Sequence, residues 1–231
     1  MTSPTQQPLS GPVEDYLKAI YDLERGEQPA ATNDIAERLA ISPASVSGMV
    51  RRLADQGLIT HEPYRGVRLT EGGRRAALRT LRRHRILECY LTEVLGYPWD
   101  RVHDEAERLE HAASEELIER MADALGNPAH DPHGAPIPSR EGVVEASASR
   151  TLGDAAAGER VRVRQVMDDD AERLRYLAEL GIRPGAIIRI LDRAPFDGPM
   201  TLWVGESGGG ATRAIGTALA AQVFVEPLGA E

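Results

Sequence analysis

The segment from residue 102 to residue 111 carries side chains of the kinds that bind metal ions. If this segment is an α-helix, with about 100° between successive residues, four of these side chains fall within roughly 100° of one another. They are His103, Glu107, Glu110 and His111. Two imidazoles and two carboxylates supply nitrogen and oxygen donors without sulfur, a donor set typical of a metal site. The alternative for such a stripe, taken alone, is a charged and solvated helix face.

Two further residues of the same chemical types lie upstream. His84 and Glu88 are four residues apart, so they share one face of a second expected helix. If the two helices pack against each other, six ligand-type side chains converge on one region.

The composition is that of an ordinary soluble protein. The chain has 231 residues, 42% hydrophobic and 27% charged, which suggests roughly one to three domains. No apolar run is long enough for a transmembrane helix, and residues 1–12 are expected to form a disordered tail rather than a signal peptide. The single cysteine, Cys89, excludes an intramolecular disulfide, fits a cytoplasmic location and is expected to be a packed thiol.

Basic residues are concentrated in one part of an otherwise acidic chain. The net charge is −9, yet ten arginines lie between Arg51 and Arg85 against only three acidic residues. A basic segment of this kind is typical of a surface that binds phosphate groups. A solvated helix face is again the alternative.

The first seventy residues predict a winged helix-turn-helix. Apolar residues recur with a helical period over residues 13–24, and Thr32 is expected to cap a short second helix. Ser42 is expected to cap a third helix, with Pro43 at its first position and Gly57 as its stop. Short strands at 58–62 and 67–70, around a turn at 63–66, predict a β-hairpin.

The rest of the chain predicts two long helices and a small β domain. One helix should reach from about residue 73 to 95, and one continuous ligand-bearing helix from about 100 to 125. Residues 130–149 are interpreted as a linker or an extended strand in which His130 and His133 are solvated. A helix at 170–180 is expected among short β runs, which lie at 160–163, 187–191, 201–204 and 222–225 and favour a small β-barrel.

The third helix is the candidate DNA reader, because the second helix of a helix-turn-helix pair enters the major groove. Its first turns offer small side chains, which predict weak base readout and apolar contacts to thymine methyl groups. The candidate contact residues are Ser42, Pro43, Ala44, Ser45 and Ser47, with Arg51, Arg52, Arg65 and Arg68 for phosphates. A winged helix used for protein contacts is the alternative.

No catalytic motif is present. The chain has His103 and Glu107 but no His-Glu-x-x-His pattern, and it contains no nucleophile elbow, Walker loop or Rossmann fingerprint. We therefore expect neither an enzyme nor a small-molecule substrate.

The order of these features resembles the diphtheria toxin repressor family from Val13 to Pro227, most densely around His84 to Glu88 and around 102–111. The Pro-His-Gly-Ala-Pro-Ile-Pro segment at 132–138 adds to it. The resemblance implies a homodimeric, metal-activated repressor of metal-uptake or metal-homeostasis genes, bound to a double-stranded DNA operator. It also implies a mainly α fold with β structure: a winged helix at 13–72, a helical metal-binding and dimerisation domain at 73–140, a linker at 141–152 and an SH3-like domain at 153–231.

Carried over residue by residue, the resemblance implies two metal sites. The primary site would use Asp15, Glu107, Glu110 and His111. The ancillary site would use His84, Glu88 and His103, to which the C-terminal domain would add Asp170, Glu172 or neither.

The same resemblance favours manganese. Asp15 and Glu107 stand where iron-sensing members have methionine and cysteine, and hard carboxylates suit Mn²⁺. Lys18 stands where manganese regulators with two adjacent ions have a glutamate, so we expect separated sites. The alternatives are an Fe²⁺-dependent repressor of the same family, or a metal-binding interaction protein that does not bind DNA.

Overall fold

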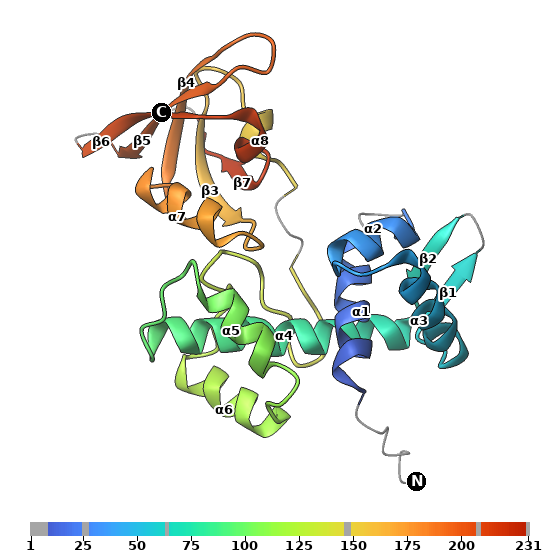
Figure 1. Cartoon of the computed structure of the whole chain (residues 1–231). Coiled ribbons are helices and arrows are strands. Elements are labelled where there is room, and N and C mark those ends of the chain that lie inside the picture. The colour runs from blue at the N-terminus through green and yellow to red at the C-terminus, as the bar shows by residue number, and fades with distance from the viewer. Residues whose placement is uncertain (1–8, 25–27, 63–64, 146–148, 207–208, 230–231) are drawn as a thin grey trace. The chain divides into compact units, whose positions relative to one another are not determined.

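The computed structural model describes residues 9–24, 28–62, 65–145, 149–206 and 209–229. They form two compact units (Figure 1). Unit 1 contains residues up to His84 together with 109–114 and 138–143. Unit 2 contains residues 85–108, 115–137 and 144 onward. The division cuts one long helix between His84 and Arg85, so it does not coincide with the expected domain boundaries at 72 and 140.

Unit 1 is the predicted winged helix-turn-helix with the first half of a long helix. Its elements are α1 (Gly11–Leu23), α2 (Thr32–Arg38), α3 (Pro43–Asp55), β1 (Ile59–Glu62), β2 (Gly66–Leu69) and the N-terminal part of α4 (Glu71–Glu93). The β1–β2 hairpin is antiparallel, with Ile59 opposite Leu69. The Ser42 side chain accepts a hydrogen bond from Ser45 N, as predicted for a cap, a contact typically worth about 1 kcal/mol.

The core of unit 1 holds α1 and α3 in place. Val46, Val50 and Leu53 recur at helical spacing along α3 and are buried. Leu17 and Ile20 of α1 are fully buried in the same cluster of apolar side chains. The outer face of α3 consequently remains exposed.

Unit 2 contains the C-terminal part of α4, two short helices and a β domain. The helices are α5 (Val102–Leu109) and α6 (Glu115–Ala124). The β domain comprises η1 (Leu152–Asp154), β3 (Arg160–Val166), α7 (Ala171–Glu179), β4 (Ile187–Arg193), β5 (Met200–Glu206), β6 (Gly209–Ile215), α8 (Thr217–Ala220) and β7 (Val223–Pro227). The five strands form an antiparallel sheet in the order β6-β5-β4-β3-β7. This is the predicted small β domain, and its core is a separate apolar cluster.

The prediction of one helix from 100 to 125 was wrong. α5 ends at Leu109 and α6 begins at Glu115, so Glu110 and His111 lie in the turn between them. The backbone closes this turn through the hydrogen bond from Ala112 N to Leu109 O. The break is not visible in the sequence, because Glu110 continues the helical spacing of the buried apolar residues in α5 and α6. Glu110 is itself buried, but its partners are polar.

Smaller differences concern the ends of elements. α1 begins at Gly11, so the expected tail is shorter, and residues 1–8 lie outside the described residues. Thr32 is the first residue of α2 rather than its cap. Strand β6 was not predicted, and Pro63 and Tyr64 of the predicted turn lie outside the described residues. No described helix is long and apolar enough to cross a membrane.

The segment around Gly134 packs tightly on β3. Val166 N donates a hydrogen bond to His133 O at 2.9 Å. Gly134 has a φ of +89°, and a Cβ atom there would lie 1.9 Å from Arg164 O. Only glycine satisfies both the left-handed backbone and this close approach.

We predict that Gly134→Ala destabilises the metal-free protein by about 2–4 kcal/mol, because conformational strain and a steric clash add together. Gly158→Ala is the matched control: its φ is +91°, but nothing lies within 4 Å of the added Cβ. It should cost only about 1 kcal/mol. Denaturant unfolding of both variants measures the difference, and equal destabilisation would contradict the close approach.

Candidate metal centres

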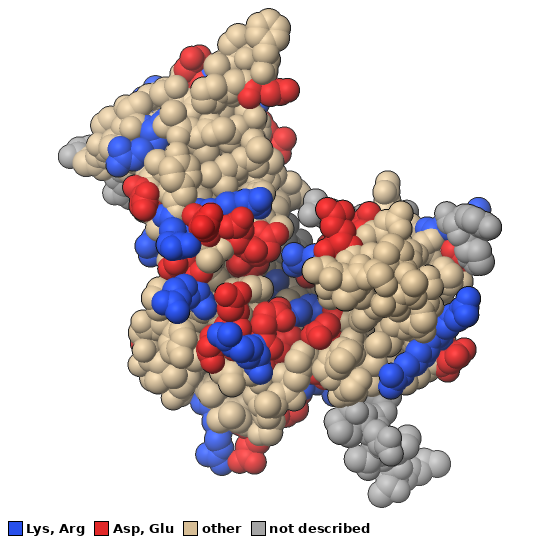
Figure 2. All heavy atoms as spheres, viewed as in Figure 1, with Lys and Arg blue, Asp and Glu red and all other residues tan. Residues whose placement is uncertain are grey.

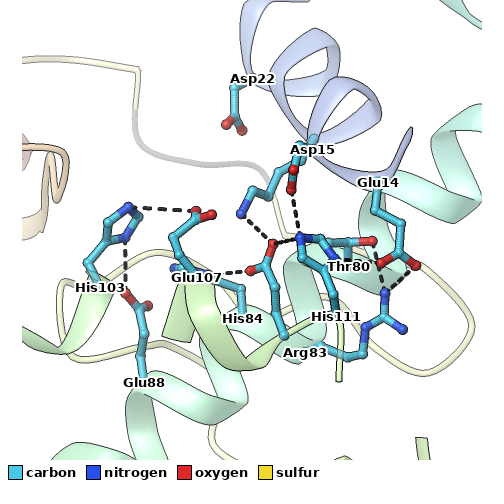
Figure 3. A network of polar contacts seen from close by, with 12 residues as sticks. Glu14, Asp15, Asp22, Thr80, Arg83, His84, Glu88, His103, Glu107 and His111 are labelled. Atoms are coloured by element: carbon cyan, nitrogen blue, oxygen red, sulfur yellow. Dashed lines mark hydrogen bonds and ion pairs between the residues drawn. The ribbon is translucent and has the colours of Figure 1, made fainter. Parts of the chain in front are cut away.

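Unit 1 contains a cluster of five polar side chains, which we call the α1 cluster. It consists of Asp15, Lys18, His84, Glu110 and His111. Asp15 and Lys18 lie one turn apart on α1, whereas Glu110 and His111 come from the turn after α5. His111 Nε2 lies 2.7 Å from Asp15 Oδ1 and 3.5 Å from Glu110 Oε1 (Figure 3). Asp15, Glu110 and His111 therefore offer one ligand atom each within a space suited to one ion.

Two residues outside this set hold the His111 ring in place. Glu14 Oε2 lies 2.7 Å from His111 Nδ1, and Glu14 Oε1 accepts a hydrogen bond from Arg83 Nη2 at 2.5 Å. A carboxylate on one ring nitrogen fixes the orientation of the ring and strengthens the other nitrogen as a ligand. The arrangement therefore directs Nε2 toward Asp15 and Glu110.

Glu110 is the most buried carboxylate of the α1 cluster, with no exposed side-chain surface. Burial alone would raise the pKa of Glu110, but the hydrogen bond from His84 and the charge of Lys18 lower it below its ordinary value. Burial raises the pKa of Asp15, against the opposing charges of His111 and Lys18. Cationic neighbours thus keep Glu110 ionised inside the protein.

Unit 2 contains a second group of ligand-type residues, which we call the α4 cluster. Its members are Glu88, His103, Asp131, His133 and Asp168. His103 Nδ1 lies 3.4 Å from Glu88 Oε1 and 3.6 Å from Asp168 Oδ2. His133 Nδ1 lies 3.7 Å and 3.9 Å from the same two carboxylate atoms.

The hydrogen bond of His133 Nε2 leaves the other ring nitrogen, Nδ1, available as a ligand for a metal ion. Nε2 donates to the carbonyl oxygen of Trp99 at 2.7 Å, so in the neutral ring Nδ1 carries the lone pair. That atom is fully buried and makes no hydrogen bond within the described part of the chain. A lone pair facing Glu88 and Asp168 is electrostatically unfavourable unless a cation lies between them. The α4 cluster therefore fits a divalent ion.

Charge crowding also perturbs the α4 cluster. Burial would lower the pKa of His103, but hydrogen bonds and charges from Asp168 and Glu88 outweigh it and raise the pKa to about 11. Burial and the nearby Glu88 charge raise the pKa of Asp131 to about 7. Without metal, protons partly neutralise this cluster at neutral pH.

The structure distributes the predicted ligands between two groups. His84 Nδ1 lies 2.6 Å from Glu110 Oε2 in the α1 cluster. Glu107 belongs to unit 2, where its Oε1 is 3.7 Å from His103 Nε2. Cys89 is buried, as predicted, and burial raises its pKa.

The C-terminal donors differ from those expected. The Asp170 carboxylate caps α7 by accepting hydrogen bonds from Glu172 N and Arg173 N, and its other oxygen pairs with the Arg173 side chain. Glu172 is the second residue of α7 and belongs to no ligand group found among the described residues. The residue of the C-terminal domain that lies next to His103 is instead Asp168.

Sequence reasoning also missed Asp131 and His133. His133 is fully buried, so the prediction that it is solvated was wrong. The signal was present in the Asp131-Pro-His133-Gly pattern, where two ligand-type residues precede a glycine that requires close packing. Distance along the chain from Glu88 concealed their proximity.

The predicted DNA-reading surface is exposed. Ser42, Pro43, Ala44, Ser45, Ser47, Arg51 and Arg52 all have exposed side chains. Figure 2 shows basic side chains gathered over the part of unit 1 that carries α3 and the β1–β2 hairpin. Arg51, Arg52 and Arg68 make no ion pair that is found within the described ranges, whereas Arg65 pairs with Glu62.

The ten arginines between 51 and 85 do not form one phosphate-binding surface. Arg74 pairs with Glu24, Arg83 with Glu14, and Arg85 with Asp131. Arg83 and Arg85 are largely buried in these pairs, and so they are not part of an exposed phosphate-binding surface. The arginines in the earlier part of the basic segment, on α3 and the hairpin, are exposed and available to a partner.

Comparison with known proteins defines the class. Residues 8–67 match the model of the iron dependent repressor N-terminal DNA binding domain, and residues 70–139 match the metal binding and dimerisation domain of the same repressors. Residues 150–227 match the FeoA domain. The chain belongs to the diphtheria toxin repressor family of metal-dependent repressors.

Individual relatives include iron-dependent and manganese-dependent proteins. The chain is 36% identical to the iron-dependent repressor IdeR of Mycobacterium leprae, over 77% of this chain and 82% of that protein. The 43% match to IdeR of Mycobacterium tuberculosis spans only 56% of that protein's length and 57% of this chain. A manganese-dependent transcriptional repressor solved in complex with manganese has a TM-score of 0.87 and 41% identity, over 94% of this chain and 100% of that one.

We predict that metal loading at pH 7 releases protons. Burial would lower the pKa of His103, but hydrogen bonds and charges from Asp168 and Glu88 raise it to about 11, so this ring carries a proton that a metal ion must displace. Metal affinity should then rise with pH, by about tenfold per pH unit for each proton released. Calorimetric titration with MnCl₂ in buffers of different ionisation enthalpy measures the number of protons released on metal binding. His103→Gln should release fewer protons, and a binding enthalpy that is the same in every buffer would contradict the prediction.

Proposed function

We propose that this chain is a homodimeric repressor whose binding to a DNA operator is switched on by Mn²⁺ and which controls genes of metal uptake or homeostasis. The observation that carries the proposal is the α1 cluster. It places donors from α1, which belongs to the winged helix, against donors from the turn after α5. A divalent ion at Asp15, Glu110 and His111 would tie these two segments together.

The choice of manganese rests on donor chemistry. The donors of the α1 and α4 clusters are carboxylates and imidazoles, and Mn²⁺ accepts such hard ligands readily. Cys89, the only thiol of the chain, is buried and donates toward His130 O at 3.6 Å. Fe²⁺ is the alternative, because it accepts similar ligands and several relatives are named as iron-dependent. Glu107 stays a predicted ligand.

The proposed switch works through the packing of α1. When bound, the ion supplies positive charge that offsets the carboxylates of Asp15 and Glu110. Asp15 then holds α1 to the turn that contains Glu110 and His111. Leu17 and Ile20 of α1 are buried in the core that also contains Val50 and Leu53 of α3. Restraining α1 therefore restrains α3, and in a dimer this sets the spacing of the two reading helices.

The dimer itself has support in exposed apolar side chains. Val94, Leu95 and Tyr97 follow the end of α4 and are 53%, 58% and 37% exposed. Exposed apolar groups gathered in one segment are typical of an interaction surface, and this segment lies in the range matched by the metal binding and dimerisation domain.

We predict that Mn²⁺ strengthens binding to a DNA duplex selected from a random library, and that a chelator reverses this. In the double variant Asp15→Ala, His111→Ala, the increase in DNA affinity caused by Mn²⁺ should be at least about tenfold smaller, because two ligands of the linking ion are removed. Parallel titrations with Fe²⁺ and Zn²⁺ rank the ions. An affinity that is equal with Mn²⁺ and chelator would indicate an interaction protein instead, and stronger activation by Fe²⁺ would indicate an iron sensor.

Phosphate contact by α3 makes a separate prediction. Arg51→Ala should weaken binding to all duplexes by a similar factor and reduce the slope of log affinity against log salt by about 1. Arg189→Ala is the control, because this arginine is exposed on β4 and is not part of the winged helix. If both variants change the slope equally, α3 is not the DNA-binding helix.

A further inference from the structure

Lys18 occupies an unusual place in the α1 cluster. Its Nζ atom lies 2.8 Å from Glu110 Oε1, with only 13% of the lysine side chain and none of the glutamate side chain exposed. It is also the only lysine of the chain, so every other Lys or Arg position carries arginine. The one ammonium group of the side chains thus lies among candidate metal ligands.

Both oxygens of Glu110 already have partners. Oε2 accepts a hydrogen bond from His84 Nδ1 at 2.6 Å, and Oε1 accepts one from Lys18. His111 Nε2 also approaches Oε1, at 3.5 Å. A metal ion that binds Oε1 between Asp15 and His111 must therefore compete with the ammonium group.

We propose that Lys18 is the resident cation of the α1 cluster and that metal binding displaces its ammonium group from Glu110. The inference rests on the proposed function, because it assumes that Asp15, Glu110 and His111 bind a divalent ion. Lys18 keeps Glu110 charged and the cluster assembled in the metal-free protein. The same contact lowers the affinity for metal, since part of the binding free energy breaks the Lys18–Glu110 pair.

Lysine suits this role better than arginine. An arginine would hold the carboxylate through a planar, often bidentate contact, whereas an ammonium group lacks this fixed planar geometry and is strongly hydrated. Lys18 has four methylene groups between its backbone and Nζ, and part of its side chain is exposed. The ammonium group can therefore leave Glu110 for water without movement of α1.

The first test measures Mn²⁺ affinity of the full chain by calorimetry and by electron paramagnetic resonance. The background variant Asp168→Asn removes one ligand of the α4 cluster, so that the α1 cluster dominates. In this background Lys18→Met, which keeps the length of the side chain without its charge, should bind Mn²⁺ at least about tenfold more tightly, the effect of losing one competing charge-assisted hydrogen bond. Lys18→Arg, which keeps a cation, should bind no more tightly than the parent.

The second test needs no substitution and so does not depend on whether Lys18→Met folds. An amine-reactive acylating reagent can modify only Lys18 and the α-amino group, and peptide mass spectrometry separates the two. Acylation of Lys18 should be several-fold faster in saturating Mn²⁺ than in chelator, with the α-amino group as internal control.

The outcomes separate the two proposals. If neither the parent nor Lys18→Met binds Mn²⁺, the proposed function fails and this inference with it. If Mn²⁺ binds but Lys18→Met binds no more tightly, or Lys18 is acylated no faster with Mn²⁺, the displacement of Lys18 is wrong while the proposed function stands.

Discussion

The architecture of unit 1 depends on one buried carboxylate. Glu110 has no exposed side-chain surface and lies in a turn between two short helices, where an unpaired charge would be strongly destabilising. His84 from α4 and Lys18 from α1 supply the compensating contacts. Three segments that are distant in the sequence are therefore held together by one charged group. Any ion that binds there acts on all three segments at once.

The negative charge of the carboxylates is offset in different ways in the two clusters. In the α1 cluster Lys18 offsets the charge of Glu110, and next to the cluster Arg83 offsets the charge of Glu14. In the α4 cluster a proton on His103 does so, because the Asp168 and Glu88 carboxylates outweigh burial and raise the pKa of this ring to about 11. The α1 cluster thus exchanges one cation for another, whereas the α4 cluster exchanges protons for metal. The two clusters should respond differently to pH.

Much of the fold was predictable, because local signals and the final packing agree. Ser42 and Pro43 begin α3 where capping chemistry places them. The end of α5 was not predictable, since Glu110 continues the spacing of buried positions while making polar contacts. Asp168 and His133 were missed because they lie in loops and only the packing of the β domain brings them to His103 and Glu88. Residue types marked the ligands, but long-range contacts decided the partners.

In the proposed switch, metal and DNA act on one equilibrium through α1, and thermodynamic linkage tests this coupling directly. If Mn²⁺ strengthens duplex binding by some factor, the duplex must strengthen Mn²⁺ binding by the same factor. The decisive measurement is the Mn²⁺ affinity of the full chain, by electron paramagnetic resonance, with and without saturating duplex. We expect tighter Mn²⁺ binding on DNA. Equal Mn²⁺ affinity in the two conditions would contradict the proposed switch.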